Sequence, residues 1–260
     1  MTSLAERLRT AHDRVHSAAV AADRDPHEIR LLLAVKTQPA ERILQALRAH
    51  ADQGSPGGVA LLGHNKIQEM DATGPALSEA GEHPGLAHEM HVIGHLQSNK
   101  INAALRWASC IQTLDTTRLA GKLDAAVARQ AERGDREVRD DEPIPVEVMV
   151  QVNTSGEESK AGVAPESARD LALAVAALPH LRLTGFMTIG ANTDDSGAVR
   201  ASFDALTQIR DDIAGSGELG TEAARELSMG MSGDLETAVA AGATMVRLGT
   251  AVFGAREPAA

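Results

Sequence analysis

Short aliphatic runs alternate along the chain with longer segments in which apolar residues recur at helical spacing. The runs predict strands at Arg30–Val35, Val59–Leu62, His91–Ile93, Cys110–Leu114, Val146–Gln151, Arg182–Met187, Glu226–Ser228 and Met245–Leu248. The longer segments predict helices at Leu4–Ala22, Ala40–Ala49, Thr117–Glu132, Pro165–Ala177, Ala198–Ile213 and Asp234–Ala241. Strands that alternate with helices are typical of a parallel sheet.

The number of predicted strands favours a closed barrel over an open doubly wound sheet. Eight strands within 260 residues fit a (β/α)8 TIM barrel, here with an extra helix before the first strand. No linker or change of composition divides the chain, so we expect residues 1–260 to form a single domain. The polar stretches Gly81–Glu89 and Glu132–Pro145 are predicted to be solvated loops before the third and fifth strands.

Composition and charge narrow the classes of function. The net charge is -11, and no predicted helix carries a basic stripe, so nucleic acid and anionic membranes are not expected partners. The single cysteine, Cys110, excludes an intramolecular disulfide and cysteine-based metal clusters. No secretory signal or membrane-spanning run is evident, and we expect a cytoplasmic protein. The chain contains no tyrosine, which excludes any mechanism that needs a phenol as acid or base.

Polar residues follow most of the predicted strands, and in a barrel the carboxyl ends of the strands hold the functional site. Lys36 directly follows the apolar run at the end of the first strand. A lysine in this position is costly to place unless it reaches water or takes part in chemistry.

The ends of the last two strands are rich in glycine and hydroxyl residues. Ser232 lies in "LSMGMSGD", before a helix predicted to start near Gly233, and Gly249 and Thr250 directly follow the eighth strand. Glycine lets a ligand approach the backbone, and a helix amino terminus offers free N–H groups to an anion. These loops therefore suit a phosphate group, although Ser232 could equally be an ordinary helix cap, with Asp234 in the first turn.

Arg247 interrupts an otherwise apolar strand and must find a partner there, because its guanidinium does not lose its charge. The partner is either a buried carboxylate or a ligand in the mouth of the barrel. A lysine, an arginine and a phosphate pocket together suit a phosphorylated aldehyde held as a Schiff base. Both pyridoxal 5'-phosphate (PLP) and the sugar phosphate of an aldolase meet that description.

Several long segments resemble the YggS/PROSC family of PLP homeostasis proteins, whose fold is similar to the N-terminal barrel domain of alanine racemase. The segments are "LLLAVKTQPAERI", "LLGHNKIQE", "HVIGHLQSNK", "VMVQVNTSGEESKAGV", "LRLTGFMTIG" and "LSMGMSGDLETAVAAGATMVRLGTAVFGAR", which extend from Leu31 to Arg256 in the order of the family. The resemblance implies that Lys36 carries PLP as a Schiff base and that Arg247 faces the pyridine nitrogen. The residues that it implies around the phosphate are Ser228, Ser232, Gly249 and Thr250.

The resemblance also implies that Asn65 lies near the cofactor, although its neighbours depart from the family's pattern. His64 and Lys66 replace the glutamate and tyrosine that usually flank this asparagine, and His95 stands where a proline is common. Gly233 takes the place of an acidic residue. These departures bear on what contacts the exposed face of the cofactor.

Four histidines lie close together, at positions 83, 88, 91 and 95, and suggest a metal site. We expect none, because His91 and His95 should bracket a strand and lie near its opposite ends. Cys110 is expected to be a small buried residue.

Three functions are compatible with these residues, and the first is preferred. It is a PLP-binding protein of intracellular vitamin B6 homeostasis without strong catalysis, which could exchange PLP with apoenzymes or amino acids. The second is a PLP-dependent amino-acid racemase, which would lack the usual tyrosine and second domain, so that His64 or His95 would have to act as the second base. The third is a class I aldolase, which the length of the motif match disfavours. A monomer is expected, because the second domain that forms a dimer surface in the racemases has no counterpart.

Overall fold

Eight parallel strands close into a barrel, as the sequence predicted. The computed structural model describes residues 2–83, 85–140, 142–157 and 160–254, so that Arg256, in the last matching segment, lies outside the described residues. The barrel strands are β1 (Arg30–Ala34), β2 (Ala60–His64), β3 (His88–Val92), β4 (Cys110–Leu114), β7 (Val146–Gln151), β8 (Leu181–Met187), β9 (Glu226–Ser228) and β10 (Met245–Leu248). Their order around the barrel is β1-β10-β9-β8-β7-β4-β3-β2, so that β1 closes the ring against β10.

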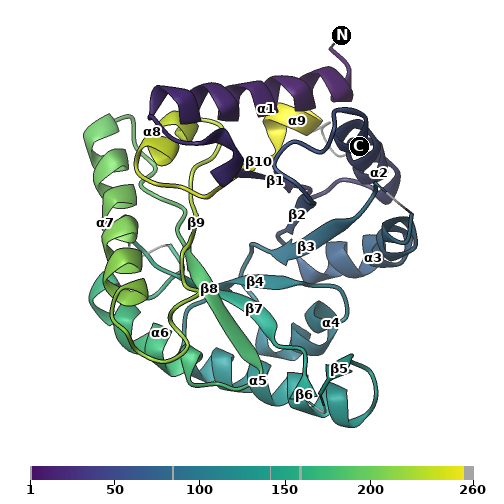
Figure 1. Cartoon of the computed structure of the whole chain (residues 1–260), viewed down its shortest axis with the longest axis vertical. Coiled ribbons are helices and arrows are strands. Elements are labelled where there is room, and N and C mark those ends of the chain that lie inside the picture. The colour runs from purple at the N-terminus through teal and green to yellow at the C-terminus, as the bar shows by residue number, and fades with distance from the viewer. Residues whose placement is uncertain (1, 84, 141, 158–159, 255–260) are drawn as a thin grey trace.

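Helices surround the barrel on its outer side (Figure 1). The α-helices are α1 (Leu4–Ala21), α2 (Ala40–Asp52), α3 (Ile67–Gly81), α4 (Ile101–Leu105), α5 (Thr117–Glu132), α6 (Ala168–Ala176), α7 (Ser196–Ala214), α8 (Leu235–Ala240) and α9 (Thr250–Phe253). Short 3-10 turns are η1 (Pro26–Glu28), η2 (Ser98–Lys100) and η3 (Pro165–Ser167). In the described part of the chain, no helix is both long and apolar enough to cross a membrane.

The hydrophobic residues form two separate layers. The larger layer lies between the strands and the helices, and the smaller one fills the inside of the barrel. The inner layer consists of Leu32, Leu61, Cys110, Met149, Met187 and Met245. Cys110 is fully buried, as expected, and burial raises the pKa of its thiol. Beside this small apolar cluster the barrel also holds buried polar side chains, among them His91 and Gln112.

Helix α1 is the additional helix that the sequence predicted, and it covers the last part of the chain. Its first turn is closed by a capping box, in which Ser3 accepts from the Glu6 N–H and Glu6 accepts from the Ser3 N–H. Its apolar face is buried, including Leu8 and Val15, and it packs beside α8, α9 and α2 (Figure 1). The side chain of Arg7 donates to the carbonyl of Val252 in α9 at 2.7 Å.

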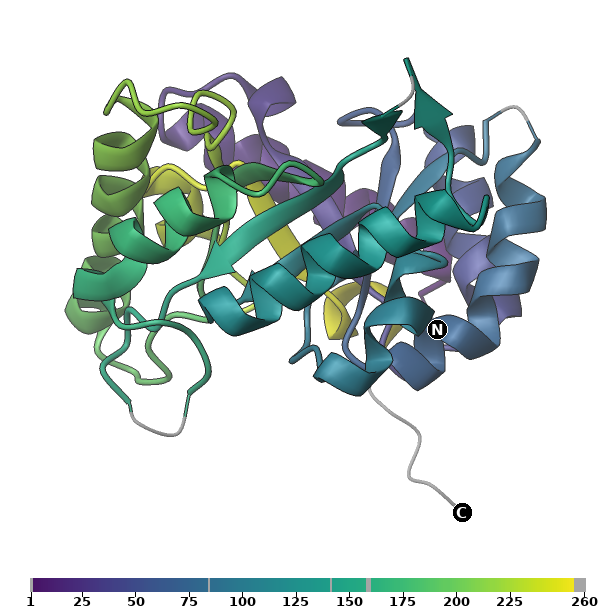
Figure 2. The ribbon, with the colours of Figure 1, turned by 90° about the horizontal axis from the view of Figure 1, so that it is seen from below.

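Two predictions about the elements were wrong. The polar stretch before the fifth barrel strand is not a plain loop, because it contains the antiparallel hairpin of β5 (Val138–Arg139) and β6 (Glu142–Pro143). This hairpin projects from the end of the barrel opposite the carboxyl ends of the strands (Figure 2). The third strand begins at His88 and not at His91. The helix predicted at Asp234–Ala241 is α8, which differs from the prediction by one residue at each end.

Helix α3 was not predicted, because its sequence contains Gly74 and Pro75, which disfavour a helix interior. Tertiary packing explains the glycine. A Cβ atom at Gly74 would lie 2.5 Å from the ring of Trp107, so only glycine lets the helix approach the indole. The indole N–H donates to Asp71 in the same helix at 2.8 Å, which ties the two elements together.

Gly185 lets strands β8 and β9 approach each other, and we expect its replacement to damage the barrel. A Cβ atom there would lie 2.0 Å from the Glu226 carbonyl oxygen, a backbone atom that cannot move aside alone. Gly185→Ala should therefore lower the free energy of unfolding by about 3 kcal/mol in urea titrations. Gly121→Ala is the matched control, since its Cβ would meet nothing within 4 Å in α5, and it should stabilise by about 0.5–1 kcal/mol. Equal stability of the two variants would contradict this account.

Candidate functional site

A pocket of about 330 Å³ opens at the carboxyl ends of the barrel strands. Its wall combines residues from six strand ends: Ala34, Lys36, Asn65, Ile93, Met187, Ile189, Met231, Ser232, Arg247, Gly249 and Thr250. Six of the seven residues selected from the sequence thus lie around one cavity. The seventh, Ser228, is fully buried, and its hydroxyl bonds to Arg247 and to Gln112.

Strand alternation explains why Lys36 reaches the pocket. Successive side chains of a strand point to opposite faces, so Lys36 shares the inner face with Leu32 and Ala34. Val35 faces outwards, where it is buried in the outer core. Lys36 is half-buried, and among the described residues no acceptor or carboxylate lies within bonding distance of its amine. The structure therefore holds a free amine at the wall of the pocket.

The turn after Lys36 is conformationally strained. The Gln38 N–H donates to the Val35 carbonyl at 3.0 Å, which closes a tight turn. Thr37 has a φ of 64°, a left-handed conformation that is rare for a β-branched residue and costs about 1–2 kcal/mol. Glu69 accepts from the Thr37 N–H at 3.3 Å and helps to hold this turn in place. The turn fixes where the chain leaves β1 and thereby where the Lys36 side chain starts.

Arg247 is buried and donates only to oxygen atoms of the protein backbone and of one hydroxyl. Its Nη1 lies 2.6 Å from the Ser228 carbonyl oxygen and 2.9 Å from the Ser228 Oγ, and its Nη2 lies 2.7 Å from the Thr188 carbonyl oxygen. Among the described residues no carboxylate lies within ion-pair distance of it. Burial lowers the pKa of Arg247 to about 10, while the charge of Asp234 opposes this shift, so the group is cationic at neutral pH. The interpretation as a fixed donor is favoured over a buried ion pair.

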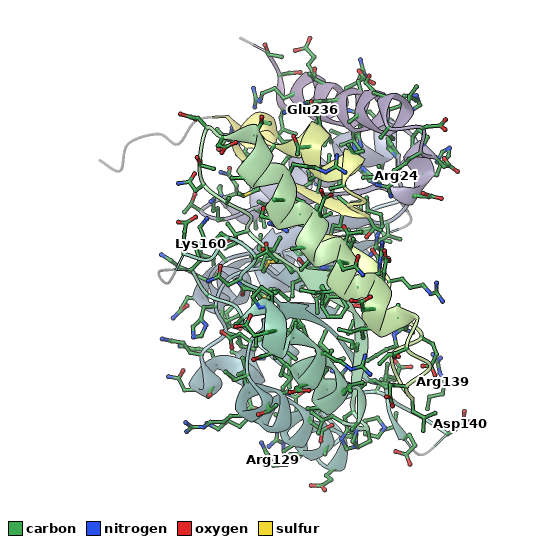
Figure 3. The ribbon with its side chains drawn as sticks, turned by 90° about the vertical axis from the view of Figure 1, so that its left-hand side faces the viewer. Arg24, Arg129, Arg139, Asp140, Lys160 and Glu236 are labelled. Carbon is green, nitrogen blue, oxygen red and sulfur yellow. The ribbon has the colours of Figure 1, made fainter. Side chains whose placement is uncertain are left out.

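The loop after β9 is held from two sides. Gly230 has a φ of 90°, and its carbonyl accepts from the Arg247 N–H at 2.9 Å. Arg14 of α1 donates to the Ser232 carbonyl at 2.9 Å and makes a bidentate bond to Glu236, at 2.6 Å for each oxygen. Figure 3 shows Glu236 beside the first helix. The N-terminal helix thus fixes one wall of the pocket.

Ser232 is not the helix cap that one interpretation of the sequence offered. Helix α8 begins at Leu235, and Asp234 takes the cap position. The Asp234 carboxylate accepts from the Met231 N–H at 2.5 Å, which closes the loop on itself. Among the described residues, the hydroxyl and N–H of Ser232 and the N–H of Gly233 have no hydrogen-bond partner, so they are available to a ligand.

Asn65 is positioned by a close contact between the loops after β2 and β3. A Cβ atom at Gly94 would lie 2.1 Å from the Asn65 carbonyl oxygen, so glycine is needed there. The neighbouring Lys66 is exposed and does not line the pocket. His64 faces away from the pocket, is 1% exposed, and has no partner for either ring nitrogen within the described residues. Burial, and then the nearby His88, lower the pKa of His64 to about 4.

The four clustered histidines are not gathered around one point. His91 lies inside β3 and is 1% exposed, so the expectation that His91 and His95 bracket this strand near its opposite ends was wrong for His91. His95 is exposed at the mouth, where its Nδ1 lies 3.9 Å from Asp115. In the part of the chain that the structure describes, no three His, Cys, Asp or Glu side chains are arranged to hold a metal ion.

The apolar part of the wall was missed by sequence reasoning. Ile93, Met187, Ile189 and Met231 line the pocket beside the polar groups. Each lies at the end of a predicted strand or just beyond it, but apolar residues there resemble ordinary core residues. Gln112, which bonds to Ser228, was also missed, although an amide inside the short strand "CIQTL" is itself unusual.

Comparison with protein families agrees with the fold. Residues 11–257 match the model of the alanine racemase N-terminal domain. The chain is 38% identical, over 99% of its length and 97% of the relative, to a pyridoxal phosphate homeostasis protein of Pseudomonas aeruginosa. It is also 38% identical to the protein of that name in Escherichia coli K12, over 99% of this chain and 98% of the relative.

Solved structures of other proteins share this fold. A protein of unknown function from Bifidobacterium adolescentis is 37% identical, with a TM-score of 0.82 and coverage of 96% of this chain and 94% of the other. PipY from Synechococcus elongatus, solved with PLP bound, is 26% identical, with a TM-score of 0.73 and coverage of 97% and 100%. Alanine racemase from Clostridium difficile, at 14% identity and a TM-score of 0.68, shares the fold over 95% of this chain and 56% of its own.

The buried His64 predicts a specific loss of stability in acid. The pKa of His64 is about 4 in the folded protein and about 6.5 in the unfolded chain. As the pH falls, the unfolded state therefore takes up a proton before the folded state does. The contribution of His64 to the free energy of unfolding is nearly constant above pH 6.5. It falls as the pH drops towards 4 and is about 2 kcal/mol lower at pH 5. His64→Leu should therefore shrink the difference in free energy of unfolding between pH 7 and pH 5 by about 2 kcal/mol.

Urea titrations at the two pH values measure this difference. His95→Leu, which removes an exposed histidine of the same region, should leave the difference unchanged. Some dependence on pH should persist in the variant, because burial also lowers the pKa of His12 to about 4. If the free energy of unfolding falls equally between pH 7 and pH 5 in wild type and in His64→Leu, His64 does not cause the fall.

Proposed function

Because the chain belongs to the family of pyridoxal phosphate homeostasis proteins, within the wider family of the alanine racemase N-terminal domain, we propose that its barrel pocket binds PLP. We propose further that the protein serves in the intracellular homeostasis of PLP. The observation that carries the proposal is the unpaired Lys36 amine at the wall of a pocket that also holds the buried cation Arg247. The PLP-bound structure of PipY supports the same ligand.

Lys36 is the residue that we propose to hold PLP covalently. PLP supplies an aldehyde that forms a Schiff base with an amine, and a ring that can withdraw electrons. The Lys36 amine suits this role because no other group among the described residues competes for it. The strained turn at Thr37 and the buried Val35 fix the backbone on either side, which limits the positions that the amine can take.

The phosphate is proposed to lie between the loops after β9 and β10. Ser232 and Thr250 offer hydroxyl groups there, and both line the pocket. The first N–H groups of α9 have no partner inside a helix, and Gly249 before them has no side chain to exclude a ligand. Ser228 is proposed to act through Arg247, because its hydroxyl is occupied by Arg247 and Gln112.

Arg247 is proposed to face the pyridine nitrogen and to limit catalysis. A guanidinium has donors only, so a ring nitrogen that accepts from it stays unprotonated. The ring is then a weak electron sink, and chemistry through a carbanion receives little support. This argument favours a PLP carrier over an enzyme.

The composition of the pocket also argues against the racemase alternative. A two-base racemase needs a second base on the other face of its substrate, and this chain has no tyrosine. Of the described residues that line the pocket, only Lys36 and Arg247 have ionisable side chains, and Arg247 stays charged at neutral pH. Of the two histidines considered as a second base, His64 is buried away from the pocket, and His95 is exposed near the mouth. We further propose a cytoplasmic monomer that exchanges PLP with apoenzymes or amino acids.

The covalent role of Lys36 is tested by trapping. Wild type incubated with PLP and reduced with borohydride should carry a phosphopyridoxyl group on the peptide that contains Lys36, as measured by mass spectrometry. Lys36→Ala should lose this adduct and stay folded, because a residue at the mouth contributes little to the core. Lys66→Ala, which changes an exposed lysine beside the pocket, should keep the adduct in full. Trapping of PLP at a specific site of Lys36→Ala would refute the assignment.

The absence of strong catalysis is tested separately. The PLP-loaded protein should convert L-alanine to D-alanine at a rate close to that of free PLP, because the pocket offers no second base. A chiral chromatographic assay with other amino acids as further substrates measures this rate. Robust turnover that disappears in His95→Leu would establish the racemase alternative instead.

A further inference from the structure

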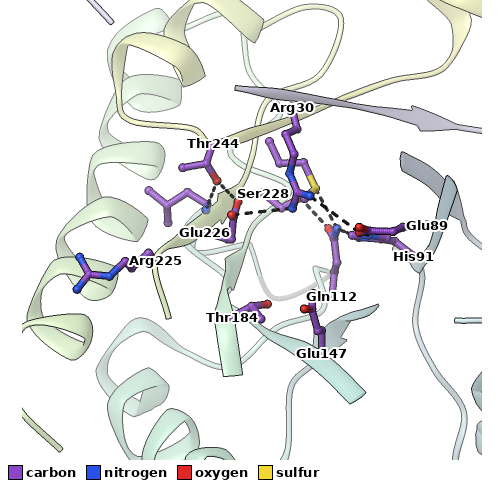
Figure 4. Close-up of polar contacts among 12 residues, drawn as sticks. Arg30, Glu89, His91, Gln112, Glu147, Thr184, Arg225, Glu226, Ser228 and Thr244 are labelled. Atoms are coloured by element: carbon purple, nitrogen blue, oxygen red, sulfur yellow. Dashed lines mark hydrogen bonds and ion pairs between the residues drawn. The ribbon is translucent and has the colours of Figure 1, made fainter. Parts of the chain in front are cut away.

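A column of buried polar side chains crosses the inside of the barrel beneath the pocket (Figure 4). The Ser228 Oγ lies 2.7 Å from the Gln112 Oε1, and the Gln112 Nε2 lies 2.7 Å from the His91 Nδ1. The His91 Nε2 lies 3.2 Å from the Glu89 Oε2. Arg247 joins the column at its upper end, through Ser228. Ser228, Gln112 and His91 are all at most 1% exposed.

The hydrogen bonds of this column have one direction. Arg247 can only donate, so Ser228 accepts from it and directs its own proton to the Gln112 oxygen. The amide nitrogen of Gln112 then faces His91 and donates to Nδ1. This leaves the imidazole proton on Nε2, where it points to the Glu89 carboxylate. Every donor in the column therefore points from the cation towards the anion.

The opposite orientation of the Gln112 amide would break the column. Ser228 would then face two donors, Arg247 and the amide nitrogen, and its own proton would lose its acceptor. A neutral His91 would have to carry its proton on Nδ1, and the lone pair of Nε2 would face the Glu89 carboxylate. Inside a protein such unsatisfied groups are costly, so one orientation is strongly preferred.

The lower end of the column lies in a second cavity, at the opposite end of the barrel. This cavity of about 310 Å³ is lined by Glu89, His91 and charged residues that include Arg30 and Glu226. The hydrogen bond from His91, and then the charge of Arg30, lower the pKa of Glu89 against the effect of burial. The carboxylate that ends the column is thus ionised at neutral pH, and its charge is held in place.

We propose that Gln112, together with His91 and Ser228, positions the Arg247 guanidinium for the ring nitrogen of bound PLP. This inference rests on the proposed function. Ser228 contacts Arg247 directly, whereas Gln112 fixes the direction of the Ser228 hydroxyl and His91 fixes the direction of the Gln112 amide. None of these three lines the pocket, so they act through Arg247 and are positioning residues.

The direction of the column can be tested without PLP. In ¹⁵N-labelled protein at neutral pH, the imidazole nitrogen shifts of His91 should report a protonated Nε2 and an unprotonated Nδ1. Gln112→Met should remove this preference, because methionine does not donate to Nδ1. A Nδ1-protonated His91 in wild type would overturn the proposed direction, whatever the protein binds.

The effect on the cofactor is measured by titration with PLP. Ser228→Ala and Gln112→Met should each raise the dissociation constant for PLP about tenfold, equivalent to about 1.4 kcal/mol. Each should also shift the absorption maximum of the bound cofactor, because the donor at the ring nitrogen is no longer fixed. The double variant should be no worse than the more severe single variant, since both interrupt the same column.

Thr184→Val is the matched control. Thr184 is also buried inside the barrel, beside the lower cavity, but it donates to the Val148 carbonyl and is not part of the column. Its replacement should leave the PLP affinity and the absorption maximum unchanged. An equal change in Thr184→Val, or wild-type affinity and spectrum in Ser228→Ala, would overturn the inference.

The two proposals fail in different ways. If wild type itself does not bind PLP, the proposed function fails, while the His91 measurement still tests the column. If wild type binds PLP and the folded column variants bind it equally well, only the positioning role fails. Circular dichroism establishes folding, and Ser228→Ala, which removes a single oxygen atom, serves if Gln112→Met does not fold.

Discussion

The arrangement of this barrel depends on a buried positive charge at its centre. Arg247 has no carboxylate partner among the described residues, so its guanidinium must be satisfied by dipoles. The carbonyl groups at the ends of β8 and β9 supply two of these, at Thr188 and Ser228. The hydroxyl of Ser228 supplies a third dipole. It is also hydrogen-bonded to Gln112, which in turn is hydrogen-bonded to His91. The same requirement explains why the inner layer contains a polar column beside a small cluster of leucine and sulfur-containing side chains.

The N-terminal helix is part of the pocket, although it lies on the outside of the barrel. Its arginines bind the two segments that form the proposed phosphate site: Arg7 holds the end of α9, and Arg14 holds the Ser232 carbonyl. The bidentate bond from Arg14 to Glu236 adds geometric precision, since both oxygens are engaged. A helix that covers the barrel therefore also fixes the loops that follow its last two strands.

The sequence allowed the barrel and most of the pocket to be predicted, because both follow from local periodicity. Lys36 continues the inner face of β1, and Gly249 follows β10 directly, so their positions depend only on strand alternation and topology. The remaining features depend on contacts between distant segments. Gly74 in α3 leaves room for the Trp107 ring, a contact that the local sequence of the helix does not reveal. The partner of Gln112, Ser228, lies 116 residues away in the sequence.

The charges around the pocket support retention of a ligand more than its conversion. Lys36 provides one reactive amine, and Arg247 provides a donor that cannot give up its proton near neutral pH. Proton transfer to and from both faces of a substrate needs further ionisable groups, and among the described residues that line the pocket only Lys36 and Arg247 are ionisable. The column beneath Arg247 makes the donor still more rigid, because every bond in it points from the guanidinium to Glu89. These charges are consistent with the proposal that the pocket holds an aldehyde and an acceptor nitrogen at fixed points and adds little further chemistry.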